Sequence, residues 1–346
     1  MSGNGQRVRL GIVGAGNMAN NHLKGWATMD DVQVVAVCDV AEDRARARAE
    51  PLGASVFTDP DRMLGESALD AVYILLPPFA HGAAERAALK YRVPFFVEKP
   101  VGMDIQFCKE IAAGVQEQGL QTGVGYMNRY RQGVQRAKAV FQQDPPVIAH
   151  GGWINGAPQT REEYGAWTWW SDKSKSGGQL VEQTTHTVDL VRSLMGDVVE
   201  VFAHGVTPRT FNKQVPPAYS IEDAMVVSLC FAGGGIATLY NSCASNAGGG
   251  VSLTVFAPQH AAYFSGWDHA LRLVTQTPDS GRAGRSEEMI AGEPDIFAVE
   301  DRQFIEALKT GNKSLVLADY PDGVKTAEVT IAANQTLETG RPVQLA

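Results

Sequence analysis

The chain contains 346 residues, of which 44% are hydrophobic and 20% are charged, and its formal net charge is −8. This length exceeds what one core usually fills and suits two domains, and the composition is that of an ordinary globular protein. The basic residues form no long run, which argues against a nucleic-acid or anionic-membrane partner.

A glycine-rich turn lies between the first predicted strand and the first predicted helix. An apolar run at 8–13 precedes the pattern Gly-x-Gly-x-x-Ala at 14–19, helical periodicity follows, and a second strand is predicted at 32–38. In such a turn the first glycine allows a tight bend, the second leaves space for a pyrophosphate, and the helix N-terminus faces the phosphates. We therefore expect the turn to bind a dinucleotide through Gly14, Gly16, Asn17 and Met18.

Asp39 closes the second strand, 23 residues after Gly16. A carboxylate at this position can accept hydrogen bonds from both hydroxyls of a ribose. It also repels a 2′-phosphate, and Val40 offers no compensating cation, so the sequence predicts NAD in preference to NADP. Arg44 would weaken this preference if it folded back onto Asp39, but a solvated helix residue is the simpler interpretation.

The alternation of strands and helices continues as far as residue 126. Apolar runs at 71–76, 93–97 and 121–126 are typical of buried parallel strands, and the segments between them have helical periodicity. This order predicts a parallel, doubly wound sheet, in which ligands bind beyond the carboxyl ends of the strands. Glu98-Lys99-Pro100 directly follows one of these strand ends.

The glycine turn and Glu98-Lys99-Pro100 together make the chain resemble the Gfo/Idh/MocA oxidoreductases. Residues 176–189, SGGQLVEQTTHTVD, are similar to the second motif of that family, a Gly-Gly turn that leads into a helix with Asp-x-x-x-His-x-x-Asp. Two positions depart from the motif, because Glu182 stands where Asp is usual and Thr184 where Gly is frequent. His81, soon after Pro77-Pro78, matches a histidine that is common there in the family.

The resemblance implies the fold class α/β plus α+β. We expect a Rossmann domain at 1–127 and, at 128–346, a substrate-binding and oligomerisation domain built on a large, mostly antiparallel open sheet. The implied activity is hydride transfer between a nicotinamide cofactor and a sugar, inositol or related polyol, performed by homodimers or homotetramers. The resemblance also places four further residues near the cofactor: Pro77, His81, Glu98 and Lys99.

Glu182, His186 and Asp189 are four and three residues apart, so on one continuous helix they share a face. A carboxylate beside an imidazole fixes its tautomer and raises its basicity, which suits a general base for alcohol oxidation. An ordinary amphipathic helix with solvated polar residues is the alternative. Glu182 would bind a neighbouring hydroxyl or orient His186, and Asp189 would hold a hydroxyl or only support the helix.

Lys99 and His186 are the predicted catalytic pair, together with Glu182. We expect His186 to accept the hydroxyl proton while Lys99 hydrogen-bonds the same oxygen, although the two can exchange these roles. Tyr126, Asn128 and Arg129 leave the last Rossmann strand and are further candidates for substrate contacts.

Four of the six tryptophans are concentrated in one short region. Their aromatic faces suit the C–H faces of sugars, whereas core or interface packing is the commoner role of tryptophan. Trp153 is the one that we assign to the substrate; the others are Trp167, Trp169 and Trp170.

After residue 198 the pattern becomes rich in strands. Runs at 224–231 and 236–240 around a glycine turn predict a hairpin, and 251–256 predicts a further strand. The polar segment 278–293 is predicted to be a surface loop. Two helices, at 297–308 and 321–337, are predicted to close the second domain.

The cysteines and the absence of a long apolar run indicate a reduced, cytoplasmic protein. No two cysteines form a Cys-x-x-Cys pair, so we expect neither a metal site nor a disulfide framework. No apolar stretch approaches the ~20 residues of a membrane span, and Met1–Gln6 lacks a signal-peptide core. Two other functions fit the same sequence: an NAD-binding regulator without turnover, and an enzyme that keeps NAD tightly bound and acts on sugars or glycosides by transient oxidation.

Overall fold

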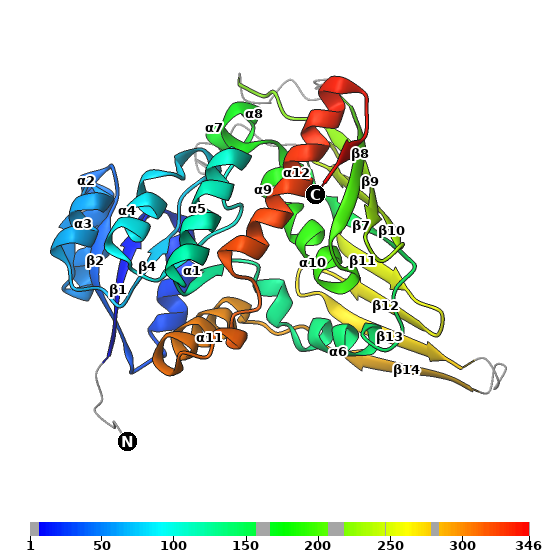
Figure 1. Ribbon diagram of the computed structural model, residues 1–346, viewed down its shortest axis with the longest axis horizontal. Coiled ribbons are helices and arrows are strands. Elements are labelled where there is room, and N and C mark those ends of the chain that lie inside the picture. Colours follow the sequence, from blue (N-terminus) through cyan, green and yellow to red (C-terminus); the bar gives the residue numbers. More distant parts are fainter. Residues whose placement is uncertain (1–6, 157–166, 207–217, 246, 278–283, 346) are drawn as a thin grey trace. The chain divides into compact units, whose positions relative to one another are not determined.

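The computed structural model describes residues 7–156, 167–206, 218–245, 247–277 and 284–345 (Figure 1). The chain divides into two compact units. The first unit comprises Met1–Met127 and Asp295–Val324, and the second comprises Asn128–Pro294 and Lys325–Ala346.

The first unit is built on a six-stranded parallel sheet in the order β3-β2-β1-β4-β5-β6. This is the strand order of a dinucleotide-binding Rossmann fold, so the predicted doubly wound sheet is confirmed. The elements are β1 (Val8–Val13), α1 (Asn17–Trp26), β2 (Val32–Cys38), α2 (Glu42–Ala49), β3 (Ser55–Phe57), α3 (Pro60–Glu66), β4 (Ala71–Ile74), α4 (Ala83–Tyr91), β5 (Phe95–Val97), α5 (Ile105–Gln118), β6 (Thr122–Val124) and α11 (Ile296–Thr310).

The second unit is built on a nine-stranded sheet in the order β14-β13-β12-β11-β7-β10-β9-β8-β15. Neighbouring strands are antiparallel except for β7 and β10, so the expected mostly antiparallel sheet is also confirmed. The elements are α6 (Gln132–Phe141), β7 (Ile148–Ile154), α7 (Trp167–Trp170), α8 (Lys173–Ser176), α9 (Gln179–Glu182), α10 (Thr185–Met195), β8 (Val198–Val206), β9 (Ala224–Phe231), β10 (Ile236–Ser242), β11 (Gly250–Phe256), β12 (His260–Ser265), β13 (Ala270–Gln276), β14 (Arg285–Ile290) and β15 (Val343–Gln344).

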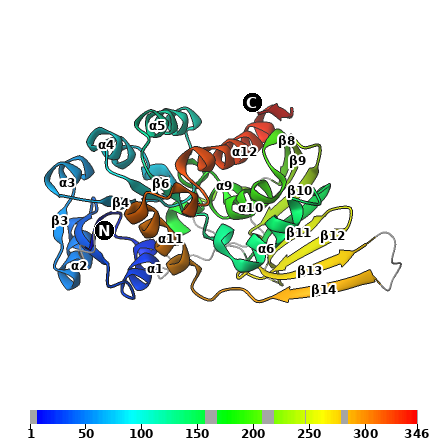
Figure 2. The ribbon, with the colours of Figure 1, turned by 60° about the horizontal axis from the view of Figure 1, so that its bottom comes forward.

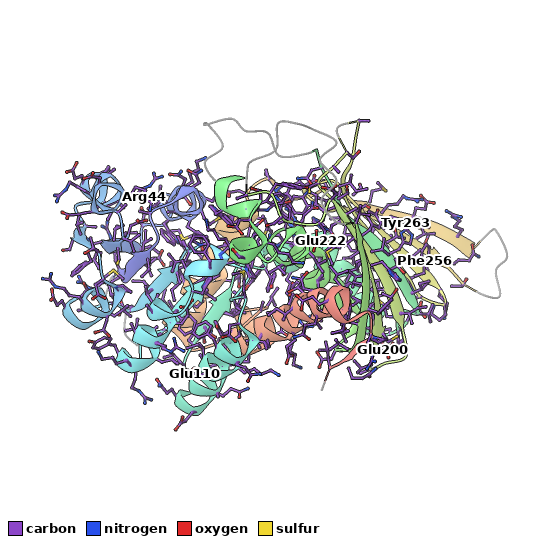
Figure 3. All side chains as sticks on the ribbon, turned by 90° about the horizontal axis from the view of Figure 1, so that it is seen from above. Arg44, Glu110, Glu200, Glu222, Phe256 and Tyr263 are labelled. Atoms are coloured by element: carbon purple, nitrogen blue, oxygen red, sulfur yellow. The ribbon has the colours of Figure 1, made fainter. Side chains whose placement is uncertain are left out.

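One face of the nine-stranded sheet forms the core of the second unit. Alternate residues of each central strand are buried there with apolar residues of α6, α10 and α12 (Tyr320–Thr339), which runs from the first unit into the second (Figure 2). The opposite face carries the other set of side chains, among them Phe256 and Tyr263 (Figure 3). None of the helices in the described ranges, α12 included, is long and apolar enough to cross a membrane.

Two predictions about the later part of the chain differ from the structure. The helix expected at 297–308 was assigned to the second domain, but α11 belongs to the first unit, because Phe304 and Ile305 complete that unit's core. The segment 278–293 was predicted to be a loop, but its described part contains β14, a polar edge strand paired with β13. An edge strand with few apolar residues lacks the alternation that sequence analysis detects.

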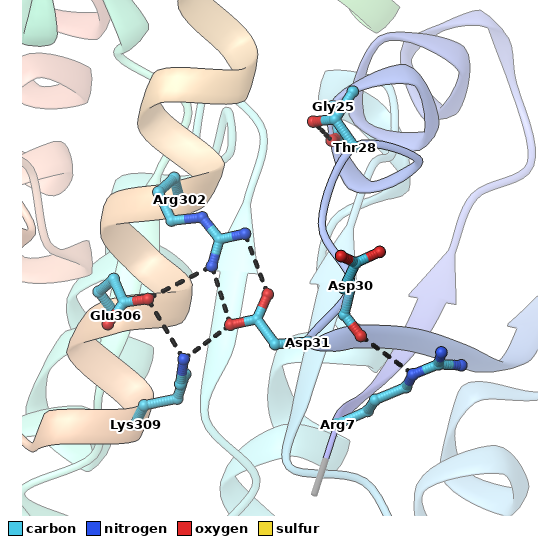
Figure 4. A network of polar contacts seen from close by, with 8 residues as sticks. All are labelled: Arg7, Gly25, Thr28, Asp30, Asp31, Arg302, Glu306 and Lys309. Carbon is cyan, nitrogen blue, oxygen red and sulfur yellow. Dashed lines mark hydrogen bonds and ion pairs between the residues drawn. The ribbon is translucent and has the colours of Figure 1, made fainter. Parts of the chain in front are cut away.

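A polar network fastens α11 to the loop before β2 (Figure 4). The Asp31 carboxylate accepts hydrogen bonds from both terminal nitrogens of Arg302, at 2.9 and 3.0 Å, and from Lys309 Nζ at 2.7 Å. These hydrogen bonds and the positive charges beside it hold the pKa of Asp31 well below its usual range. The carboxylate therefore stays ionised and paired over the whole neutral range.

His22 of α1 is fully buried in the first unit. Its Nδ1 lies 2.9 Å from Asp301 Oδ1 of α11, and its Nε2 lies 3.3 Å from Glu98 Oε1 after β5. Both ring nitrogens therefore face a carboxyl group, and an imidazolium offers one N–H donor to each of them. Burial by itself lowers the pKa of His22, but Asp301 and Glu98 outweigh burial and raise the pKa to about 10.

This pKa predicts how the contribution of His22 to stability depends on pH. Because the folded-state value lies above the unfolded value of 6.5, the stabilisation is complete below about pH 6.5 and is lost as the pH rises through about 10. We expect His22→Gln to lower the free energy of unfolding by about 3 kcal/mol at about pH 6, since it leaves buried carboxylates without their partner. Urea unfolding of both proteins at about pH 6, 8 and 10 checks this, and a difference that does not shrink with pH contradicts it.

Candidate active site

The glycine turn before α1 has the shape that a pyrophosphate needs. Gly14 has φ +101°, and a Cβ there would lie 2.4 Å from the backbone oxygen of Leu75, so no other residue fits. Beside Gly16, by contrast, no heavy atom lies within 4 Å of the position of a Cβ. The first turn of α1 carries no side-chain cap, which leaves its N–H groups available to a phosphate. Asn17 and Met18 supply the first residues of that turn.

Asp39 is held rigidly at the end of β2. Its Oδ2 accepts the N–H of Ala15 in the glycine turn at 2.9 Å, and its Oδ1 accepts the N–H of Ala41 and a nitrogen of Arg44, both at 2.9 Å. Arg44 of α2 (Figure 3) thus folds back onto the carboxylate. The simpler interpretation of the sequence, in which Arg44 is only a solvated helix residue, does not hold. A carboxylate has about four lone-pair sites. These three donors occupy three of them, so one remains for a ribose hydroxyl as long as Arg44 is bound to Asp39.

Glu98 and Lys99 follow β5, and their environments differ. The buried Glu98 side chain is engaged by His22 on one oxygen and by the N–H of Lys99, at 3.1 Å, on the other. A Cβ at Gly125 would lie 2.6 Å from Glu98 Oε1, so a glycine there makes room for the carboxylate. Glu98 therefore holds the end of β5 in place. Lys99, the next residue, is only half-buried and so remains partly accessible.

Pro77 and His81 flank a short 3₁₀ helix after β4. The His81 side chain is buried, and its Nδ1 lies 2.6 Å from Oε1 of Glu85. The other oxygen of Glu85 accepts the N–H of Gly82 at 2.7 Å. A hydrogen on Nδ1 that binds the carboxylate leaves Nε2 as an acceptor. Sequence analysis missed Glu85, although its spacing of four residues from His81 was the available signal.

The predicted single helix through residues 182–189 is interrupted. α9 ends at Glu182 and α10 begins at Thr185, because the N–H of Thr184 bonds to the oxygen of Gln179 and the N–H of His186 to that of Gln183. The expectation that Glu182 and His186 share the face of one continuous helix is therefore wrong. Glu182 instead accepts a hydrogen bond from Trp170 Nε1 at 2.8 Å.

Arg129 and Asp189, both predicted to contact substrate, form a buried ion pair with each other. Arg129 Nε and a terminal nitrogen donate to the two oxygens of Asp189 at 2.8 and 2.6 Å. Thr326 adds a third donor to Asp189 at 3.1 Å. Their geometry indicates that this pair supports α10, the helix that carries His186.

His186 lies beside Trp267 of the second unit, and Trp267 in turn lies beside Trp153. The His186 ring faces Trp267 edge-on, with a centroid distance of 6.0 Å and an interplanar angle of 89°, and Trp267 lies 5.1 Å from Trp153. Sequence analysis did not single out Trp267, which is 46% exposed in the turn between β12 and β13. The available signal was a tryptophan after a glycine in a connection between strands, where packing does not require an aromatic residue.

The remaining candidates are buried. Tyr126 at the end of β6 and Asn128 are almost fully covered, and Asn128 Oδ1 accepts a hydrogen bond from Arg131 Nε at 2.7 Å. Trp170 packs with Ile221 and Cys243 in a small cluster, and Trp169 lies against it, which is a packing role. The side chain of Trp167 lies outside the described residues.

Comparison with known proteins identifies both parts of the chain. Residues 8–126 match the oxidoreductase family with an NAD-binding Rossmann fold, and residues 146–260 match a Gfo/Idh/MocA C-terminal domain. The chain is 27% identical to the scyllo-inositol 2-dehydrogenase (NAD(+)) of Bacillus subtilis, over 98% of this chain and 96% of the relative. It is 26% identical to the D-glucoside 3-dehydrogenase of Escherichia coli, over 98% and 97%. An NAD-binding oxidoreductase from Klebsiella pneumoniae has a similar structure, with a TM-score of 0.85 at 19% identity over 98% and 99% of the two chains.

The contact between Arg44 and Asp39 predicts a change in cofactor preference. Arg44→Ala removes a cation that offsets the carboxylate, so a 2′-phosphate meets more negative charge and a ribose hydroxyl gains a free lone pair. We expect the ratio of NADPH to NADH dissociation constants to rise about tenfold, the effect of one lost charge-assisted hydrogen bond. Fluorescence titration with each cofactor measures the ratio. Arg46→Ala, which removes an arginine of the same helix that pairs with Glu42, is the control, and an equal loss of both affinities contradicts the prediction.

Proposed function

The chain belongs to the Gfo/Idh/MocA oxidoreductase family, and on that premise we propose that it is an NAD-dependent dehydrogenase of a sugar, inositol or related polyol. The proposal rests mainly on the glycine turn and Asp39. Only glycine fits at position 14, and the space beside Gly16 is free of heavy atoms. The Asp39 carboxylate is fixed beside this turn by its hydrogen bond to Ala15. The relatives that act on inositols and glucosides match over nearly their full length, which supports a hydroxyl of a polyol as the reacting group.

We assign the binding of NAD to residues of the first unit. The pyrophosphate would bind at Gly16 and the first turn of α1, and the adenosine ribose at Asp39. The carboxylate favours NAD over NADP, and Arg44 moderates that preference without removing it. When bound, NAD supplies the acceptor for the hydride that leaves the substrate carbon.

The protein's own residues manage the proton and the charge of the substrate oxygen. We assign His186 the role of general base for the hydroxyl proton, and Lys99 the role of hydrogen-bond donor to the substrate oxygen as negative charge develops. The ion pair of Arg129 and Asp189 keeps the helix of His186 in place. Trp170 donates a hydrogen bond to the Glu182 carboxylate, and we assign this carboxylate to a second substrate hydroxyl.

The open face of the nine-stranded sheet supports assembly into a homodimer or homotetramer. Phe256, Ile148 and Ile236 are partners in adjacent strands β11, β7 and β10, so they form one row across this face. Ile148 is 43% and Ile236 50% exposed, which leaves an apolar patch that a second copy would cover.

Loss of the two catalytic side chains should abolish turnover and spare the binding of the cofactor. We expect Lys99→Met and His186→Gln each to lower kcat/KM at least about a thousandfold, the effect of removing a positioned proton-transfer or charge-stabilising group. NADH formation with scyllo-inositol, myo-inositol and methyl β-D-glucoside measures turnover, and NADH fluorescence measures binding. Turnover that survives in Lys99→Met contradicts the assignment. A wild-type protein that binds NADH but forms none of it from the three substrates contradicts the proposed function.

Charge on the open sheet face should disrupt the assembly. We expect Ile148→Lys combined with Ile236→Lys to shift the wild-type oligomer to a smaller species, because the buried ammonium groups would have no partner. Size-exclusion chromatography with light scattering measures the mass. Val40→Lys, at an exposed residue of the first unit, is the control. An unchanged mass of the double variant places the interface elsewhere.

A further inference from the structure

Trp267 is a large apolar side chain that remains exposed on a rigid turn. It lies between β12 and β13, where Gly266 adopts φ +74° and His269 φ +50°. The N–H of His269 bonds to the oxygen of Gly266 at 3.2 Å and closes the turn. Because nearly half of the indole stays in contact with solvent, packing within the described residues does not account for its position.

Two buried side chains support the backbone of this tryptophan. Arg131 is only 1% exposed, and its guanidinium donates to the carbonyl oxygens of Trp267, at 3.2 Å, and of Glu293, at 3.1 Å. His269 Nδ1 lies 3.0 Å from the same Trp267 oxygen. Burial lowers the pKa of His269 to about 4, so at neutral pH the ring is uncharged and donates one N–H to this carbonyl.

This support of the turn requires the burial of a charged side chain. A guanidinium that is almost fully buried is expensive to desolvate, and here two of its donors bind backbone oxygens, that of Trp267 in the turn and that of Glu293 after β14. The result is an indole whose backbone is already ordered, so a ligand that rests on it loses little further conformational entropy. The rings of Trp153 and His186 both lie next to the indole of Trp267 and extend the aromatic surface.

We propose that Trp267, with Trp153 beside it, is the surface on which the C–H face of a cyclic substrate rests next to His186. This inference rests on the proposed function and narrows its substrate class to cyclitols and pyranosides. The axial hydrogens of a ring with equatorial hydroxyls form a flat apolar face, and an aromatic ring binds such a face well. An open-chain polyol offers no such continuous face, and its rotatable bonds must be frozen on binding.

The test compares Trp267→Ala and Trp267→Phe with the wild-type protein. For scyllo-inositol and methyl β-D-glucoside we expect Trp267→Ala to raise KM about tenfold or more with kcat within about threefold, since the platform binds the ring without taking part in proton transfer. Trp267→Phe, which keeps an aromatic face, should recover most of the loss. D-sorbitol and galactitol should be oxidised with less than about a hundredth of the kcat/KM of the cyclic compounds. Tyr91→Ala, at an exposed aromatic residue of the first unit, is the control and should leave both constants unchanged.

Each of the other experimental outcomes contradicts a specific part of this proposal. An unchanged KM in Trp267→Ala overturns the platform, and equal turnover of open-chain and cyclic polyols overturns the substrate class. A lower melting temperature together with an equal loss of kcat in both Trp267 variants indicates a structural role and also overturns the platform. A wild-type protein that oxidises none of the cyclic compounds contradicts the proposed function itself, which distinguishes that failure from failure of the inference.

Discussion

The first unit depends on one buried imidazolium. His22 lies on the helix that begins at the glycine turn, and its two N–H groups bind Glu98 behind Lys99 and Asp301 on α11. Three segments far apart in the sequence are thereby held by a single charged group. Two carboxylates at such depth would be prohibitively costly without it, so the geometry of the cofactor turn and that of the Lys99 strand end are tied to the same protonation state.

The second unit uses buried charge in the same way. Arg129 binds Asp189 through two parallel hydrogen bonds and fixes α10, whereas Arg131 binds backbone oxygens and fixes the turn of Trp267. These two arginines are two residues apart in the sequence and serve different elements. Both arginine side chains are buried and bonded within the protein, whereas Trp267 is 46% exposed.

Local patterns predicted the parts of the site that depend on local geometry. The glycine turn, Asp39 and the strand end before Lys99 lie in the elements that the sequence predicted, because each is marked by particular residues at short, fixed spacings. The place of α11 was not predictable, because only the tertiary contacts of Phe304 and Asp301 assign it to the first unit. The break after Glu182 was missed because a spacing of four residues is the same whether or not the hydrogen-bond ladder is continuous. Trp267 was missed because its partners, Trp153 and His186, are more than 80 residues away in the sequence.

The proposed function requires that this protein move a hydride from a ring carbon of a polyol to NAD. The most direct measurement is to incubate the wild-type protein with NAD and scyllo-inositol deuterated at every ring carbon, and to examine the reduced cofactor by proton NMR. We expect deuterium at nicotinamide C4 on one face only, together with slower turnover than with unlabelled substrate. Reduced cofactor without deuterium, or no reduced cofactor from any cyclic polyol, would contradict it.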